Sequence, residues 1–127
     1  RVERLKELPD IPKDEHVLLA IDEAQFFPDI VSYVRGFWDA GYSNLEVVVC
    51  GLNGDFQQKP FGVEPHWISK LICIASECKY LKARCWKTGG EATFSIRKPE
   101  CKGNSVVVIG GEDLYTAASR KYVTLEE

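Results

Sequence analysis

The fold is decided by the stretch Val17-Leu18-Leu19-Ala20-Ile21-Asp22-Glu23-Ala24-Gln25-Phe26-Phe27, in which five apolar residues lead directly into two adjacent carboxylates. A continuous apolar run bounded by polar residues is typical of a strand buried on both faces, as in a parallel sheet. Open α/β sheets bind their ligands outside the carboxyl ends of such strands. The pattern therefore predicts a strand at about 16–22, with Asp22 and Glu23 at its functional end.

Two interpretations of the acid pair are open from this stretch alone. Apolar residues followed by Asp-Glu match the second motif of P-loop nucleotide hydrolases and kinases, in which the Asp holds Mg²⁺ and the next acid handles the nucleophile. The alternative is a buried strand that ends in a solvated turn, because any α/β protein can show the same pattern.

Composition bounds the class of protein. A chain of 127 residues with 45% apolar and 28% charged residues is typical of one compact globular domain. The net charge of −3 indicates no basic surface for nucleic acid, and no apolar run approaches the roughly 20 residues of a membrane span. Because the N-terminal residues are charged rather than signal-like, we expect a cytoplasmic protein. From the net charge and the lack of a long apolar run, we expect no nucleic-acid or membrane partner.

Five cysteines are present, and they show no CxxC spacing: Cys50, Cys73, Cys78, Cys85 and Cys101. An odd count without a secretory signal favours reduced, mostly buried thiols over a disulfide framework.

Periodicity predicts the order of the elements. Residues 2–8 have the spacing of a short helix, and residues 28–41 that of an amphipathic helix started by Pro28 and Asp29. A second apolar strand follows at 45–52. Strand, helix and strand in this succession predict a right-handed βαβ unit with parallel strands.

The loop at 53–62 carries Phe56 and Phe61 and leaves the same sheet edge as the acid pair. These aromatic rings either pack beneath the loop or line a pocket for a flat ligand, and their position at this edge favours the pocket. A second helix is expected at 65–77, followed by short strands at 80–86, 92–97 and 105–109. We therefore divide the chain into an α/β core, 1–79, and a β-rich lobe, 80–127.

Five stretches in different parts of the chain form one ordered set: IDEAQFFPDI (21–30), GLNGDFQQKPFG (51–62), LKARC (81–85), EATFSIR (91–97) and VIGGEDLY (108–115). Together they resemble the type II, zinc-ribbon class of thymidine kinases over nearly all of the chain after about residue 16. The resemblance implies an α/β fold with a P-loop-kinase-like parallel sheet core and a small β-rich lasso or ribbon lobe. It also implies a homo-oligomer, since relatives form tetramers.

The activity implied by the resemblance is transfer of the ATP γ-phosphoryl group to the 5′-hydroxyl of thymidine, with Mg²⁺, to give dTMP for nucleotide salvage. Glu23 matches the catalytic base, and Asp22 matches the acid that holds Mg²⁺ through water. Ala24 and Gln25 complete the matching ATP-side segment. This division of labour suits phosphoryl transfer, which needs a metal to bind developing charge and a base aimed at the nucleophile.

The resemblance also implies a nucleoside site. Matching positions around the nucleoside are Phe26, Leu52, Phe56, Phe61 and Tyr115. Val106, Val108 and Gly110 fall in the lasso whose backbone reads the thymine edge, and Ser95 matches a small hydroxyl residue that touches the base. For all of these residues the alternative is ordinary core or loop packing.

Two departures from the family pattern stand out. The 127 residues contain no Gly-x-x-x-x-Gly-Lys-Ser/Thr, the loop that cradles phosphates. The chain therefore resembles the C-terminal two-thirds of such a kinase, and activity of these residues alone is in doubt. The zinc-ligand pairs of relatives align with Cys85 and Thr88, and with Ser119 and Tyr122. One thiolate in four cannot form a tetrahedral zinc site, so we expect no zinc.

Three hypotheses follow for function. The first is the thymidine kinase portion itself, with the phosphate cradle on other residues. The second is a pseudokinase half that binds nucleoside or an active partner copy. A helicase-type motor is the third, but further motor motifs and a basic surface are not visible in the sequence.

Overall fold

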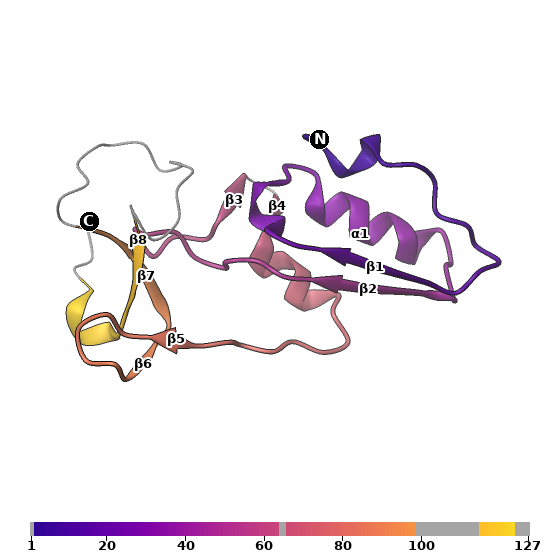
Figure 1. Cartoon of the computed structure of the whole chain (residues 1–127). Coiled ribbons are helices and arrows are strands. Elements are labelled where there is room, and N and C mark those ends of the chain that lie inside the picture. The colour runs from indigo at the N-terminus through magenta and orange to yellow at the C-terminus, as the bar shows by residue number, and fades with distance from the viewer. Residues whose placement is uncertain (1, 64–65, 99–114, 124–127) are drawn as a thin grey trace. The chain divides into compact units, whose positions relative to one another are not determined.

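The computed structural model describes residues 2–63, 66–98 and 115–123, and it contains two compact units (Figure 1). The first unit comprises residues 1–53 and 60–76, and the second comprises residues 54–59 and 77–127. The loop after Asn53 thus belongs to the second unit, and the chain returns to the first at Pro60. The division into an α/β core, 1–79, and a β-rich lobe, 80–127, stays a prediction.

The first unit is built on strand β1 (Val17–Ile21), helix α1 (Ile30–Asp39) and strand β2 (Leu45–Val49). The strands are parallel, in a register that runs from Val17 opposite Leu45 to Ile21 opposite Val49. In Figure 1, α1 lies alongside both strands. The predicted strand–helix–strand unit is therefore confirmed, and the fold is mixed α/β with short parallel and antiparallel sheets.

The core of the first unit lies on one face of this sheet. Its buried residues are Leu5, Ile21, Ala24, Ile30 and Leu71. Successive side chains of a strand point to opposite faces, so the other face carries Leu18, 65% exposed, and Val48, 43% exposed. The prediction that both faces are buried is wrong for the described chain, because α1 and the short helices cover only one of them.

The Asp29 side chain, just before α1, links the start of this helix to the N-terminal segment by hydrogen bonds. The amide N–H groups of Leu5 and Lys6, both in the 3-10 helix η1 (Leu5–Glu7), each donate to an Asp29 carboxylate oxygen at 3.0 Å. Burial raises the pKa of Asp29, but these amide donors, with the charge of Arg4, outweigh it and hold the pKa below its ordinary value. The ionised carboxylate is therefore the form that stabilises the fold.

The Asp29→Asn variant is expected to lose about 1–3 kcal/mol of unfolding free energy at neutral pH, because its amide group can accept only one of the two N–H bonds. A carboxyl whose folded pKa is depressed stabilises above its unfolded pKa, and the contribution is lost as the pH falls through the folded pKa. The difference between wild type and variant should therefore shrink below about pH 4 in denaturant titrations. Asp39→Asn, at an exposed position in the last turn of α1, should change stability by less than about 0.5 kcal/mol. An equal loss in both variants would contradict the account.

The helix predicted at 65–77 is found only in part, as a shorter helix of the 3-10 type. The segment forms a short antiparallel pair, β3 (Gly62–Val63) with β4 (His66–Trp67), and then a 3-10 helix, η3 (Ile68–Cys73). An i, i+3 repeat of apolar residues fits a 3-10 helix as well as an α-helix. Leu71 of η3 is buried in the core, and Ile68 packs against it. Ile72 is 55% exposed.

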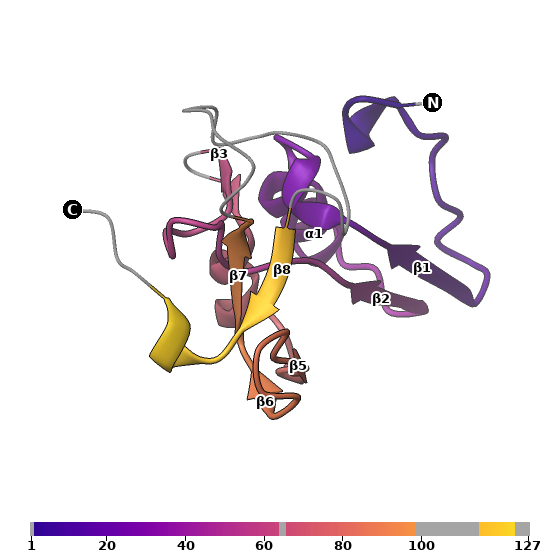
Figure 2. The same ribbon diagram turned by 60° about the vertical axis from the view of Figure 1, so that its left-hand side comes forward.

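The described residues of the second unit form two short antiparallel pairs (Figure 2). Strand β5 (Ala83–Arg84) pairs with β6 (Glu91–Ala92), and β7 (Phe94–Arg97) pairs with β8 (Tyr115–Ala118). A 3-10 helix, η4 (Arg120–Tyr122), follows β8. The buried apolar residues described in the second unit are Cys85, Ala92, Ala118 and Val123. The strand β8 was not expected, and the strand expected at 105–109 lies outside the described residues.

The cysteines of the described chain are free thiols, as predicted. Cys50, Cys73 and Cys78 are exposed and Cys85 is buried, so the expectation that most are buried is wrong. Among the described residues, none of the helices has the length and apolar character required to cross a bilayer.

Candidate functional site

Asp22 and Glu23 follow β1 directly and both are exposed. Two backbone hydrogen bonds tie this turn to the end of β2: Cys50 N donates to Ile21 O at 2.9 Å, and Ala24 N donates to Cys50 O at 3.0 Å. The acid pair is therefore fixed at the carboxyl end of the parallel strands, where its sequence position predicted it.

Glu23 has a strained backbone and an oriented side chain. Its φ of 50° and ψ of 41° lie in the left-handed region, which costs a residue other than glycine roughly 1 kcal/mol or more. Asp22 Oδ1 accepts the Glu23 N–H at 2.9 Å, and Glu23 Oε2 accepts a hydrogen bond from Gln25 Nε2 at 2.6 Å. Such strain persists where surrounding contacts determine the conformation, and it occurs often at functional sites.

Gln25 is the residue that connects the two strand ends. It is 4% exposed; while its Nε2 donates to Glu23, its Oε1 accepts the N–H of Leu52 at 3.1 Å. Both ends of the amide are thus used, which fixes the side-chain orientation and with it the Glu23 carboxylate. Sequence reasoning assigned Gln25 to the ATP side only. In the structure Gln25 also holds the Glu23 carboxylate in place, a contact that is visible only in the folded chain.

Gly51 allows this close approach. A Cβ atom at this position would lie 2.6 Å from Gln25 Oε1 and 3.3 Å from the backbone nitrogen of Ala24. Real Cβ contacts are essentially never as short as the first of these distances. The glycine is therefore part of the support for Glu23, although the sequence signal for it was only its place in the 51–62 motif.

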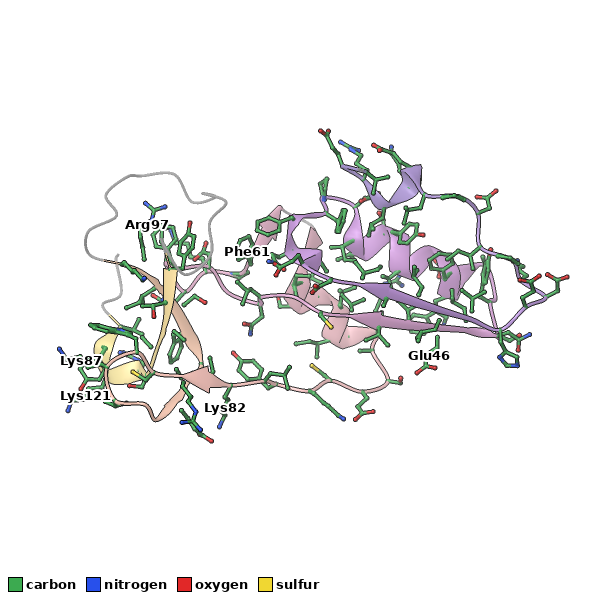
Figure 3. The ribbon with its side chains drawn as sticks, in the orientation of Figure 1. Glu46, Phe61, Lys82, Lys87, Arg97 and Lys121 are labelled. Carbon is green, nitrogen blue, oxygen red and sulfur yellow. The ribbon has the colours of Figure 1, made fainter. Side chains whose placement is uncertain are left out.

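Three of the predicted nucleoside residues lie in the first unit. The ring of Phe61, which is labelled in Figure 3, meets the ring of Phe26 edge to face, with centroids 5.6 Å apart and an interplanar angle of 85°. Phe61 is held there by its N–H, which donates to Asn53 O at 3.0 Å. Phe26 is 44% exposed and Leu52 is 47% exposed. These exposed apolar side chains follow the same strand ends as the acid pair and are free to contact a ligand.

The other aromatic pair lies in the second unit. The ring centroids of Phe56 and Tyr115 are 6.2 Å apart, with an interplanar angle of 35°. Arg97 (Figure 3) places its guanidinium carbon 4.3 Å from the Phe56 centroid and 6.0 Å from that of Tyr115. A cation over two rings is an attractive arrangement. Sequence reasoning missed Arg97, whose only signal is that it ends the 91–97 motif.

Ser95 is placed beside this pair by the 54–59 loop. Gln58 Nε2 donates to the Ser95 carbonyl at 3.1 Å and to the Phe56 carbonyl at 2.9 Å. The buried Asp55 carboxylate closes the loop by accepting the N–H groups of Gln57 at 2.8 Å and Lys59 at 3.0 Å. The structure therefore brings Phe56, Ser95 and Tyr115 together within one unit. Val106, Val108 and Gly110 lie outside the described residues.

Sequence comparison assigns the chain to a family. A family model described as thymidine kinase matches residues 2–123. The chain belongs to the thymidine kinase family. The resemblance read from the five motifs is thereby confirmed at the level of the family.

Individual relatives agree with this assignment. Thymidine kinase of fowlpox virus is 39% identical over 114 residues, which cover 90% of this chain and 57% of the viral protein. The vaccinia virus (strain Western Reserve) enzyme is 38% identical over 82% of this chain and 54% of its own length, and human cytosolic thymidine kinase is 39% identical over 81% and 40%. The chain thus spans about half the length of the viral relatives it matches.

Proposed function

We propose that the chain is the base-bearing and nucleoside-binding portion of an ATP-dependent thymidine kinase. The 5′-hydroxyl oxygen of thymidine attacks the γ-phosphorus of ATP, the bond from that phosphorus to the bridging oxygen breaks, and ADP leaves with dTMP as the product. The hydroxyl proton passes to Glu23. The observation that carries the proposal is the Glu23 carboxylate, exposed at the strand end and held by Gln25 at 2.6 Å.

Asp22 suits the role of a magnesium ligand. Its carboxylate is exposed, and among the contacts of the described residues only Oδ1 is engaged, by the Glu23 N–H. Mg²⁺ is usually held by one or two carboxylates together with substrate phosphates and waters, so a cage of protein ligands is not required. Within the described chain no group of three or more His, Cys, Asp or Glu residues gathers as a metal site. When bound, the ion would neutralise charge on the β- and γ-phosphates.

Phosphate binding is proposed to come from residues outside these 127. Positioning a triphosphate needs backbone amides and a lysine of the P-loop type, and the sequence has no such motif. The open face that carries Leu18 and Val48 supports this proposal, because parallel sheets are normally covered on both faces. On a longer or tandem polypeptide, a phosphate-binding strand would pair with an edge of this sheet, and its helix would cover that face.

Calorimetric titration separates the two candidate functions. We expect the complete polypeptide to bind both thymidine and Mg-ATP, and the 127-residue chain alone to bind thymidine without measurable affinity for Mg-ATP. The second candidate, a pseudokinase half, is favoured by the missing phosphate motif. It requires the complete polypeptide to fail on Mg-ATP as well, and that outcome would overturn the kinase proposal.

The Phe61→Ala variant of the complete enzyme is expected to raise the KM for thymidine by roughly 5- to 100-fold, since stacking on an aromatic ring contributes about 1–3 kcal/mol per base. The turnover number should change less, because the substitution leaves the proposed base, Glu23, unaltered. Steady-state kinetics with varied thymidine measure both constants. Trp38→Ala removes an exposed ring on α1 and serves as the control; an unchanged KM in Phe61→Ala would remove this residue from the pocket.

A further inference from the structure

The loop that carries Phe56 is joined to strand β7 by one of its own side chains. Asp55 N donates to Lys59 O at 2.9 Å, and Gln58 N donates to Asp55 O at 3.0 Å, so the loop is a closed turn. Gln58 Nε2 donates to the Phe56 carbonyl at 2.9 Å and, over a separation of 37 residues, to the Ser95 carbonyl on β7 at 3.1 Å. These two hydrogen bonds from one nitrogen form what we call the Gln58 bridge.

The two carbonyl groups fix the orientation of the Gln58 amide. If the amide were turned over, its oxygen would lie against two other oxygens, and none of the three could donate a hydrogen bond. In the orientation that the carbonyls require, Gln58 Oε1 is buried and has no hydrogen-bond partner among the described residues. Most buried polar atoms in proteins are paired, and an unpaired one lowers stability. The chain therefore keeps the bridge although it leaves an unsatisfied oxygen.

The backbone of Gln58 is strained as well. Its φ is +60°, in the left-handed region that residues other than glycine seldom adopt. Such a conformation also lowers stability, and it persists where the surrounding contacts determine it, often at functional sites. Two separate unfavourable features thus coincide at the residue that makes the bridge.

The bridge fixes two parts of the candidate nucleoside site relative to each other. Phe56 contributes a ring whose centroid lies 6.2 Å from that of Tyr115, and Ser95 lies on β7 opposite Ala117 of β8. Because the Phe56 and Ser95 carbonyls share one donor nitrogen, their backbones cannot move apart without breaking a hydrogen bond. Groups that contact a ligand are held in place by supporting bonds of this kind.

We propose that Gln58 is a positioning residue of the nucleoside site, which holds the Phe56 ring and Ser95 at the spacing that a pyrimidine nucleoside requires. The inference rests on the proposed function, because it takes these two residues as nucleoside contacts. Contacts that are already ordered do not have to be ordered when the ligand binds, which favours binding. Loss of the bridge should therefore weaken nucleoside binding and leave the transfer step at Glu23 unchanged.

Exchange of the side-chain amide protons tests the bridge itself. In the complete polypeptide without ligand, both Nε2 protons of Gln58 should exchange with solvent at least about tenfold more slowly than those of free glutamine, because each is bonded to a carbonyl. Nuclear magnetic resonance measures both rates. Exchange as fast as in free glutamine would overturn the proposal, whatever the activity of the protein.

Substitution of Gln58 tests the positioning role. Gln58→Met keeps the length of the side chain but has no N–H group, so it should raise the KM for thymidine by at least about fivefold and leave kcat within about twofold. Its melting temperature should change little, because removal of the unsatisfied oxygen offsets the lost bonds. Gln58→Glu places an oxygen against the two carbonyl oxygens and should raise KM further. A fall in kcat with an unchanged KM would contradict the positioning role.

Gln57→Met is the matched control. Gln57 is the neighbouring residue and is also half-buried, and its bond to Asp55 is made by the backbone N–H, which the substitution keeps. Its KM should equal that of the wild type. An equal rise in KM for Gln57→Met and Gln58→Met would overturn the proposal. A wild-type polypeptide that forms no dTMP would instead count against the proposed function, and thymidine calorimetry on the same variants would then measure the effect of the bridge as a change in Kd.

Discussion

The Glu23→Gln variant of the complete polypeptide is expected to have a kcat lower by roughly 10²–10⁴ than the wild type, the usual effect of removing a general base. The amide has nearly the same size as the carboxylate, and its oxygen can still accept the bond from Gln25 Nε2. It cannot take the 5′-hydroxyl proton. The KM for thymidine should therefore change little, since a general base acts on the reaction more than on ground-state binding.

A matched control for this prediction is Glu46→Gln. Glu46 is an exposed carboxylate on β2 (Figure 3), paired in register with Leu18. Its conversion to the amide changes the net charge equally and should leave kcat within about twofold, because surface substitutions away from the site have small effects. A Glu23→Gln enzyme that turns over as fast as this control would exclude Glu23 as the base.

The Gly51→Ala variant is expected to lose about 1–3 kcal/mol of unfolding free energy and about 10²-fold in kcat. The added Cβ at 2.6 Å from Gln25 Oε1 displaces that side chain, which leaves the Leu52 N–H without its acceptor and Glu23 without its partner. The displaced Gln25 amide, which is buried, loses both bonds, and an unsatisfied buried group has that energetic cost. A misplacement of about 1 Å in the proposed base costs about this much in rate. Thermal unfolding and steady-state kinetics on the same preparation measure both effects.

The control for Gly51→Ala is Gly36→Ala. A Cβ at Gly36 would meet nothing within 4 Å, and alanine in the interior of α1 should add about 0.5–1 kcal/mol of stability. The mechanism can also be isolated, because Gly51→Ala made on top of Gln25→Ala should have little further effect on kcat. Equal rate losses from Gly51→Ala in both backgrounds would show that the glycine does not act through Gln25.

The sequence was sufficient for the parts of the fold that follow from strong periodicity. The runs at 17–21 and 45–49 are mostly apolar segments that flank an amphipathic helix, so their parallel pairing could be predicted. The segment at 68–73 was misassigned because an apolar repeat of three fits two kinds of helix. The strand β8 was missed because Tyr115–Ala118 is short and lacks a clear alternation of polar and apolar residues.

Some features of the candidate site could likewise be predicted from the sequence, and others could not. Asp22 and Glu23 could be placed at a strand end because strand direction fixes which residues leave the sheet. The link from Gln25 to Leu52, over a separation of 27 residues, depends on how two loops approach each other. Arg97 over Phe56 is likewise a tertiary contact. Periodicity carries no signal for such contacts, so they could be found only in the folded chain.

Formation of dTMP by the complete polypeptide is the most direct test of the account. Incubated with thymidine, ATP and Mg²⁺, the protein should form dTMP and ADP in equal amounts, and the Glu23→Gln variant should bind thymidine yet lose nearly all of this product. A complete polypeptide that binds both substrates and forms no dTMP, or a Glu23→Gln variant that forms it at the wild-type rate, would contradict the account.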